Sequence, residues 1–401
     1  MGAVTGRLCP PRQAQDLTRP AAADLARVIA AGSVGWFHLW QQSWVGAGEL
    51  TFWPRSGAAW VDGMILLSAF CLFLPWANAM ADGQACPACR PADFYRRRAV
   101  RLLPAYYVNL LVSLVLALSR KGWSTHLIRD LAAHLTMTQM LVPDAYIGTE
   151  LNGVTWTLTV LTLLYLIFPL LARCMFFAPM PTVTVLLGVQ LAWRTAVLRL
   201  QGQAAYSLLF NQFPAFASTF AIGMTGAVAL AYLGRSRRLA GFSARLCCTI
   251  LGLGAFGLAG AVLRQLSMAR DYQAFQLEYR TVLVGCICAS LVLLALGLPI
   301  PLRRVWALLA EISYSFYLWH QMLAVWLKYD LHLPAWSGEL PPNQLGDTVW
   351  MHRYNALAWG VALLAAVAST WLVEKPAARW LKKPGGKSQP IASEPKEQYN
   401  T

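Results

Sequence analysis

The sequence predicts an all-α polytopic membrane protein with about ten transmembrane helices and both termini in the cytoplasm. Hydrophobic residues make up 57% of the 401 residues and charged residues only 13%, about half the charged share of a typical soluble domain. Apolar runs long enough to span a bilayer recur along most of the chain. The 17 tryptophans and 14 tyrosines are typical of two interfacial aromatic belts.

The apolar runs define the expected helices in order. They cover 24–44, 58–78, 101–119, 154–173, 176–193, 207–232, 246–263, 281–299, 305–327 and 355–373. Lys and Arg are concentrated, roughly two to one, in the segments that a cytoplasmic N-terminus would place inside. This bias also accounts for the formal net charge of +15. We therefore expect the lipid bilayer, and no nucleic acid, as a partner.

The sequence predicts one membrane domain, over residues 23–376. A cytoplasmic N-terminal segment at 1–22 would precede it, and a cytoplasmic tail at 377–401 would follow. The tail is rich in Lys, Pro, Gly and Ser, a composition typical of disorder. Neither a cleavable signal peptide nor an extracytoplasmic second domain is predicted.

The first expected helix, 24–44, carries two ionisable side chains, Arg27 and His38. They are eleven residues apart, close to three full turns, so both lie on one face, about 16 Å apart along the axis. Ionisable residues inside a bilayer are costly and by default mark a functional path. A structural interpretation is also open, with Arg27 as a cytoplasmic anchor and His38 as a core histidine bonded to a neighbouring helix.

The long outer loop at 120–153 contains a short amphipathic segment that begins at the capping residue Ser124. His126, Asp130 and His134 recur every four residues in it, so they share one helical face. We predict no metal site there, because no further ligand is evident nearby.

Five groups of residues resemble, in order along the chain, the motifs of the acyltransferase-3 family. They are Arg27 with His38; Val61-Asp62 with Ser68-Ala69-Phe70, where Ala69 replaces the usual glycine; Phe94 to Pro104; Ile312-Ser313-Tyr314 through His320; and Val373-Glu374-Lys375-Pro376. Members of this family are ten-helix membrane proteins that O-acylate carbohydrates of the cell surface and antibiotics. The resemblance implies the same fold and a membrane acyltransferase.

One family motif is altered in this chain. The segment from Trp156 to Tyr165 resembles the family's fourth helix on both flanks. Leu161, however, stands where the family has a glutamate that is thought to assist the histidine, and Leu163 stands where it has a glutamine.

The resemblance also implies a reaction and a location. An acyl group, expected to be acetyl, would pass from cytoplasmic acyl-CoA to a hydroxyl of a carbohydrate or glycosylated acceptor. The protein would lie in the bacterial cytoplasmic (inner) membrane as a multi-pass protein. Without an extracytoplasmic domain, the acceptor would meet the membrane domain directly, or a separate extracytoplasmic partner would carry the acyl group onward.

Binding of acyl-CoA requires cations at the inner end of the path, because the CoA head carries several negative charges. Arg98 and Arg101 are three residues apart on the third helix and share a face. They hold positions of the family motif, although positive-inside anchoring is the alternative. With the head bound there, an extended pantetheine arm could run from Arg27 towards His38.

His38 is the expected catalytic residue, either as a neutral general base or as a nucleophile. A carboxylate on its second ring nitrogen would orient it, and Leu161 cannot supply one. Asp62 is our first candidate, because the second helix is expected to lie antiparallel beside the first; a helix cap is its alternative role. The other candidates are Asp144, Glu150, Thr159, Thr162 and Tyr165.

An aromatic group on the ninth helix is expected to line a pocket for the acceptor or the acyl chain. Tyr314, Tyr317 and His320 lie within two turns of each other. Trp156, Tyr165 and Ser313 are further lining candidates from the motifs. Interfacial aromatic residues are the alternative interpretation.

The changes at Leu161 and Leu163 motivate an alternative function. The chain would then be a non-catalytic member that binds or moves an acylated small molecule or lipid. We favour the enzyme, because His38, Arg98, Arg101 and His320 are all present and such groups are costly in or beside lipid.

Overall fold

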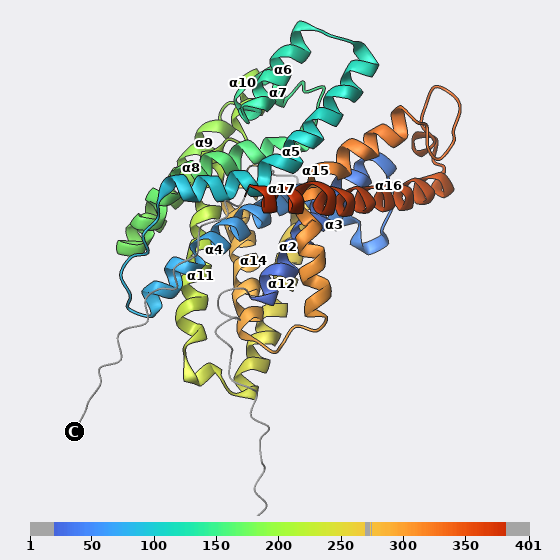
Figure 1. Cartoon of the computed structure of the whole chain (residues 1–401). Coiled ribbons are helices and arrows are strands. Elements are labelled where there is room, and N and C mark those ends of the chain that lie inside the picture. Colours follow the sequence, from blue (N-terminus) through green and yellow to red (C-terminus); the bar gives the residue numbers. More distant parts are fainter. Residues whose placement is uncertain (1–19, 269–272, 274, 382–401) are drawn as a thin grey trace, which may run out of the picture.

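The computed structural model describes residues 20–268, 273 and 275–381, and every regular element within them is a helix (Figure 1). The ten long helices within this part of the chain are α2 (Ala21–Ser43), α4 (Trp60–Ala81), α5 (Pro91–Lys121), α8 (Trp156–Phe177), α9 (Pro179–Leu198), α11 (Ala217–Gly234), α12 (Phe242–Met268), α14 (Arg280–Leu296), α15 (Arg303–Tyr329) and α16 (Thr348–Ser369). A long helix thus overlaps each of the ten expected ranges.

Eight of the helical stretches in the described residues are long and apolar enough to cross a membrane. The helices α2 and α15 are not among them, although they have 23 and 27 residues. Both carry polar side chains, including Arg27 and His38 in α2 and His320 in α15. These polar side chains lower the hydropathy of α2 and α15, and several of them belong to the expected site.

One expected helix is shorter than its apolar run. The run at 207–232 was expected to be continuous, but α11 begins only at Ala217. Before it lie the short helix α10 (Ala204–Leu209) and a 3-10 turn at Phe213–Phe216 that contains Pro214. Proline lacks the amide N–H that a helix interior requires, so the apolar run is broken there.

The helices differ in how much of their surface other helices cover. About 72% of the apolar stretch at Gly57–Ala81 is buried, against 28% for Gly153–Phe177 and for Phe242–Met268. Large apolar side chains such as Leu170 on α8 and Ile250 on α12 are exposed. We interpret α4 as a central helix, and α8 and α12 as helices whose outer faces contact lipid.

Helix α2 packs against both α4 and α15. The side of α2 that is buried has mainly small residues, including Ala30, Ala31 and Ser33. A Cβ atom at Gly35 would overlap the ring of Phe316 on α15. Small residues therefore allow these two helices to approach closely, which brings His38 beside His320.

The segment after α5 forms two shorter helices, α6 (Thr125–Leu135) and α7 (Pro143–Tyr146), at one edge of the molecule (Figure 1). The predicted capping role of Ser124 is confirmed, because its Oγ accepts a hydrogen bond from the backbone N–H of Leu127 at 2.9 Å. Of the expected terminal segments, 1–19 and 382–401 lie outside the described residues, and the short helix α17 (Lys375–Trp380) crosses the expected boundary at 376.

Candidate active site

Three cavities follow one another through the helical domain. The basic cavity, of about 640 Å³, is lined by Arg27, Arg96, Arg97, Arg101 and Lys375, among others. It shares Arg27, Cys71, Arg101 and Tyr314 with a central cavity of about 260 Å³. The central cavity in turn shares Val61 and Tyr317 with the histidine cavity, of about 530 Å³, which contains His38. The cavities therefore adjoin one another, and we call this series, from the basic end to His38, the path.

Cations outnumber acids around the basic cavity. Its acidic side chains are Asp24, Glu311 and Glu374. Asp24 lies 3.6 Å from Arg27, and Glu311 lies 3.0 Å from Lys375. Arginine binds phosphate oxygens well because its guanidinium presents several donors in a fixed plane. This end of the path is suited to an anionic group.

The central cavity is smaller than the basic cavity and more apolar. Arg98 lines it beside Arg27 and Arg101, and so do Ser313, Tyr314 and Tyr165. The hydroxyl groups of Tyr165 and Ser68 lie 2.9 Å apart, and the Tyr314 hydroxyl donates to the carbonyl of Leu102 at 2.8 Å. Leu161 is also part of this wall. A leucine fits the apolar surroundings there.

His38 lines the third cavity and has mostly neutral neighbours. Its Nδ1 lies 3.2 Å from the Oε1 of Gln41, and the centroid of its ring lies 5.2 Å from that of His320. His320 is fully buried, and its Nδ1 lies 2.9 Å from the carbonyl oxygen of Tyr317. A carbonyl only accepts hydrogen bonds, so Nδ1 of His320 carries the proton. Its Nε2 has no hydrogen-bond partner among the described residues.

Asp62 lies in the wall of the same cavity, but its carboxylate has other partners. It forms an ion pair with Arg280 at 2.8 Å, and it accepts a hydrogen bond from Thr219 at 2.9 Å. The expected contact between the helices of Asp62 and His38 is present. The predicted orienting role of Asp62 on His38 stays a prediction.

Sequence reasoning missed the cations of the histidine cavity. Arg55, in the short helix α3 (Phe52–Arg55), lines it, and Arg280 lies at the start of α14. Arg280 directly precedes the apolar run at 281–299 and therefore resembles an ordinary helix-end anchor in the sequence. Only the three-dimensional fold brings it to Asp62.

The other candidates to orient His38 have different surroundings. Glu150 pairs with Lys121 at 2.8 Å, and Asp144 lies 3.6 Å from Arg129. Thr159 is buried, its hydroxyl without a hydrogen-bond partner in the described part of the chain, while Thr162 contacts the sulfur of Met137. None of these four side chains lines the histidine cavity.

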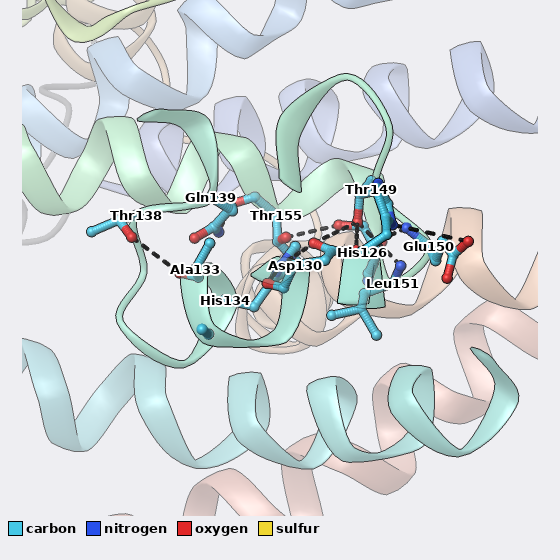
Figure 2. A network of polar contacts seen from close by, with 12 residues as sticks. His126, Asp130, Ala133, His134, Thr138, Gln139, Thr149, Glu150, Leu151 and Thr155 are labelled. Atoms are coloured by element: carbon cyan, nitrogen blue, oxygen red, sulfur yellow. Dashed lines mark hydrogen bonds and ion pairs between the residues drawn. The ribbon is translucent and has the colours of Figure 1, made fainter. Parts of the chain in front are cut away.

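Figure 2 shows the polar network beside α6. Asp130 accepts from the hydroxyl of Thr149 at 3.0 Å and from the backbone N–H of Glu150 at 2.8 Å, and its Oδ1 lies 2.9 Å from Nδ1 of His134. No group of three His, Cys, Asp or Glu in the described residues has the spacing of a metal site. We interpret this network as structural.

The network is connected to the segment that leads into α8, and this segment binds Tyr317 in the wall of the histidine cavity. Gln139 donates to the carbonyl of Thr155 at 2.8 Å (Figure 2). Tyr317 donates to the carbonyl of Val154 at 2.7 Å, and its hydroxyl also lies 2.8 Å from that of Thr157. The segment 149–157, which runs into the first turn of α8, thus fixes Tyr317, and Tyr317 lines both the central and the histidine cavities.

Trp156, the first residue of α8, lines the histidine cavity. Its ring packs edge-on against Tyr146 of α7, at 6.1 Å between centroids. Burial raises the pKa of the Tyr146 hydroxyl, which accepts a hydrogen bond from Asn211 at 3.1 Å. The neutral phenol therefore supports the aromatic wall without adding charge.

Comparison with known proteins identifies the family of this chain. A family model described as an acyltransferase domain matches residues 21–375. Nodulation protein 10 of Rhizobium leguminosarum bv. viciae is 24% identical over 390 residues, which cover 88% of this chain and 92% of that protein. No solved structure gives a significant match. Since the family model matches most of the chain, the chain belongs to the acyltransferase-3 family of multi-pass membrane proteins.

Proposed function

We propose that this protein is a membrane O-acyltransferase that moves an acyl group, acetyl in the simplest case, from cytoplasmic acyl-CoA to a hydroxyl of a carbohydrate or glycosylated acceptor. The observation that carries the proposal is the series of cavities. Arginines gather at one end, His38 lies at the other, and neighbouring cavities share wall residues. Two substrates could thus meet from opposite sides.

The donor would enter through the basic cavity. The CoA phosphates would bind Arg96, Arg97 and Arg101, and the pantetheine arm would extend through the central cavity past Arg98 and Arg27. The rise of α2 from Arg27 to His38 is about 16 Å. That length is of the order of an extended pantetheine arm.

The acceptor would occupy the histidine cavity, with its hydroxyl at His38. The imidazole would take the hydroxyl proton while the oxygen attacks the thioester carbonyl. Collapse of the tetrahedral intermediate would expel the CoA thiolate, which receives the proton from His38. The Oε1 of Gln41 only accepts, so its contact favours a proton on Nδ1 of His38 and leaves Nε2 available as the base.

The proposed topology has ten crossing helices, the eight apolar stretches together with α2 and α15. Both termini would be cytoplasmic, in a bacterial inner membrane. The distribution of Lys and Arg supports this orientation. Acylation would finish at the outer surface, either directly on the acceptor or through a separate extracytoplasmic partner.

Leu161 gives a specific reason to keep the non-catalytic alternative. At the position where the family has an acidic residue, this chain has Leu161, which lines the central cavity. In that case the cavities would bind an acylated small molecule or lipid without transferring the acyl group.

Turnover of labelled acetyl-CoA by the protein in lipid vesicles tests the proposal. We expect slow thioester hydrolysis, or transfer to an added acceptor, that disappears in His38→Ala. His352→Ala is the matched control, because His352 is an exposed histidine of α16 outside the three cavities. Equal turnover by wild type and His38→Ala would refute the mechanism. Absence of CoA binding would favour the non-catalytic alternative.

A further inference from the structure

The described residues that line the histidine cavity carry more positive than negative charge. Among the described residues, its charged lining side chains are Arg55, Asp62 and Arg280. The pair of Asp62 and Arg280 is held at 2.8 Å and is nearly inaccessible, with side-chain exposures of 1% and 9%. This pair is close to neutral as a unit, so the excess charge comes from Arg55.

Arg280 is held rigidly in the cavity wall. One of its terminal nitrogens binds Asp62, and the other donates to the Oε1 of Gln276 at 2.9 Å. Its guanidinium also lies over the ring of Phe216, at 5.1 Å from the centroid. The buried Nε has no hydrogen-bond partner among the described residues. Arg280 is therefore fixed in the cavity wall, and both of its terminal nitrogens already have partners.

Arg55 has a different environment, at the exposed rim of the cavity. It ends α3, and its side chain is solvent-exposed. None of the acidic side chains in the described part of the chain forms an ion pair with it. Its five N–H donors are therefore free to bind a ligand that enters the cavity.

Such a cavity attracts anions. Field lines from an unneutralised cation are focused by walls of low dielectric constant, which raises the local concentration of anions. The walls here are largely apolar and aromatic, with Phe37, Trp156 and Phe216 among them. A guanidinium also binds a carboxylate or a phosphate through two parallel hydrogen bonds. Both effects favour a ligand that carries a negative group.

We propose that the acceptor carries an anionic group, a carboxylate or a phosphate, which binds Arg55 at the rim of the histidine cavity and directs a hydroxyl towards His38. This inference rests on the proposed function, because the ligand is an acceptor only if the protein transfers an acyl group. The preference of the cavity for anions, however, can be measured without turnover. It adds a second anion site, at the opposite end of the path from the basic cavity.

Charged thiol reagents measure the potential inside the cavity. Ala58 is exposed and lines the histidine cavity three residues after Arg55, so Ala58→Cys places a thiol beside that arginine. We would compare 2-sulfonatoethyl with 2-(trimethylammonium)ethyl methanethiosulfonate, each rate divided by the rate of that reagent with free cysteine. Mass spectrometry of the peptide that contains residue 58 separates this thiol from the native cysteines.

We expect the normalised rate of the anionic reagent to exceed that of the cationic reagent by about tenfold. Adding Arg55→Gln should reduce this ratio to about two. Adding Arg129→Gln is the matched control, because Arg129 is an exposed arginine outside the cavity, and it should leave the ratio unchanged. Equal normalised rates for the two reagents in Ala58→Cys would overturn the proposal.

Competition then distinguishes the two kinds of anion. Glucuronate and glucose 1-phosphate would each be added at the same concentration as glucose during the reaction with the sulfonate reagent. Protection by glucuronate beyond that by glucose indicates a carboxylate, and protection by glucose 1-phosphate indicates a phosphate. No greater protection by either anion than by glucose would contradict the proposal. Because no acyl transfer is required, these results are independent of whether His38 proves catalytic.

Discussion

Two histidines in this protein have contrasting environments. His134 on α6 is fully buried, with its Nδ1 2.9 Å from a carboxylate oxygen of Asp130. His38 on α2 is half-buried in a cavity wall, and its partners are the side-chain amide of Gln41 and the ring of His320. The histidine with a carboxylate partner is thus in the structural network, and the histidine without one lies in the cavity.

This difference shows that a histidine–carboxylate pair does not by itself mark a reactive site. Asp130 also binds Thr149 and the backbone of Glu150 (Figure 2), so its charge is used to hold a loop. At His38, neutral partners avoid an additional buried charge within the membrane domain. With neutral partners, the ring of His38 is oriented by packing and by hydrogen bonds of moderate strength.

Removing His38 should lower the rate of acetyl transfer, whereas removing His134 should lower the stability of the protein. His38→Ala is expected to lower the acetyl transfer rate at least 100-fold, since a positioned general base contributes about 10²–10⁴. His134→Ala should keep the rate per folded molecule within about threefold and lower the thermal stability. Both are measured on protein recovered as a single species by size-exclusion chromatography. A comparable loss of rate in the two folded variants would remove the distinction between the sites.

The carboxylate of the structural network should matter for stability. Asp130→Ala leaves the Thr149 hydroxyl and the Glu150 N–H without their acceptor and removes the carboxylate beside His134, whose Nδ1 keeps the backbone carbonyl of residue 130. We therefore expect a loss of about 3 kcal/mol in the free energy of unfolding. Asp330→Ala is the control, because the Arg120–Asp330 pair is partly exposed and such pairs contribute about 0–1 kcal/mol. Denaturant unfolding in detergent provides the comparison. Equal losses would argue against a structural role for Asp130.

His320 should have a smaller effect that acts through His38. His320→Phe retains an aromatic ring beside Phe316 and His38 but removes the unpartnered Nε2. We expect the turnover number to fall about tenfold with little change in the KM for acyl-CoA, because replacing a ring that packs 5.2 Å from that of His38 would displace the catalytic imidazole. A wild-type turnover number would assign His320 to packing alone.

The sequence predicted the fold better than the partners of its charged residues. The spacing of Arg27 and His38 on one helical face needed only helix geometry, and α2 carries both. The pairing of Asp62 with Arg280 could not be predicted, because it joins the first turn of α4 to the start of α14. Such long-range pairs depend on how helices pack, and a short apolar pattern contains no information about that.

The sequence also did not show which cavity Leu161 lines. Of these substitutions, replacement of Leu161 should have the smallest effect on turnover. Leu161 lines the central cavity and not the histidine cavity, so the carboxylate of Leu161→Glu is not expected to reach His38. We predict no gain in turnover and a KM for acyl-CoA about threefold higher, because a negative charge beside Arg98 and Arg101 would compete with the anionic donor for these cations. Leu161→Gln, which adds a polar group without the charge, should leave the KM closer to wild type. A tenfold rise in turnover with Leu161→Glu would instead mean that this position does act on His38, and that the neutral environment of His38 limits the rate of the natural protein.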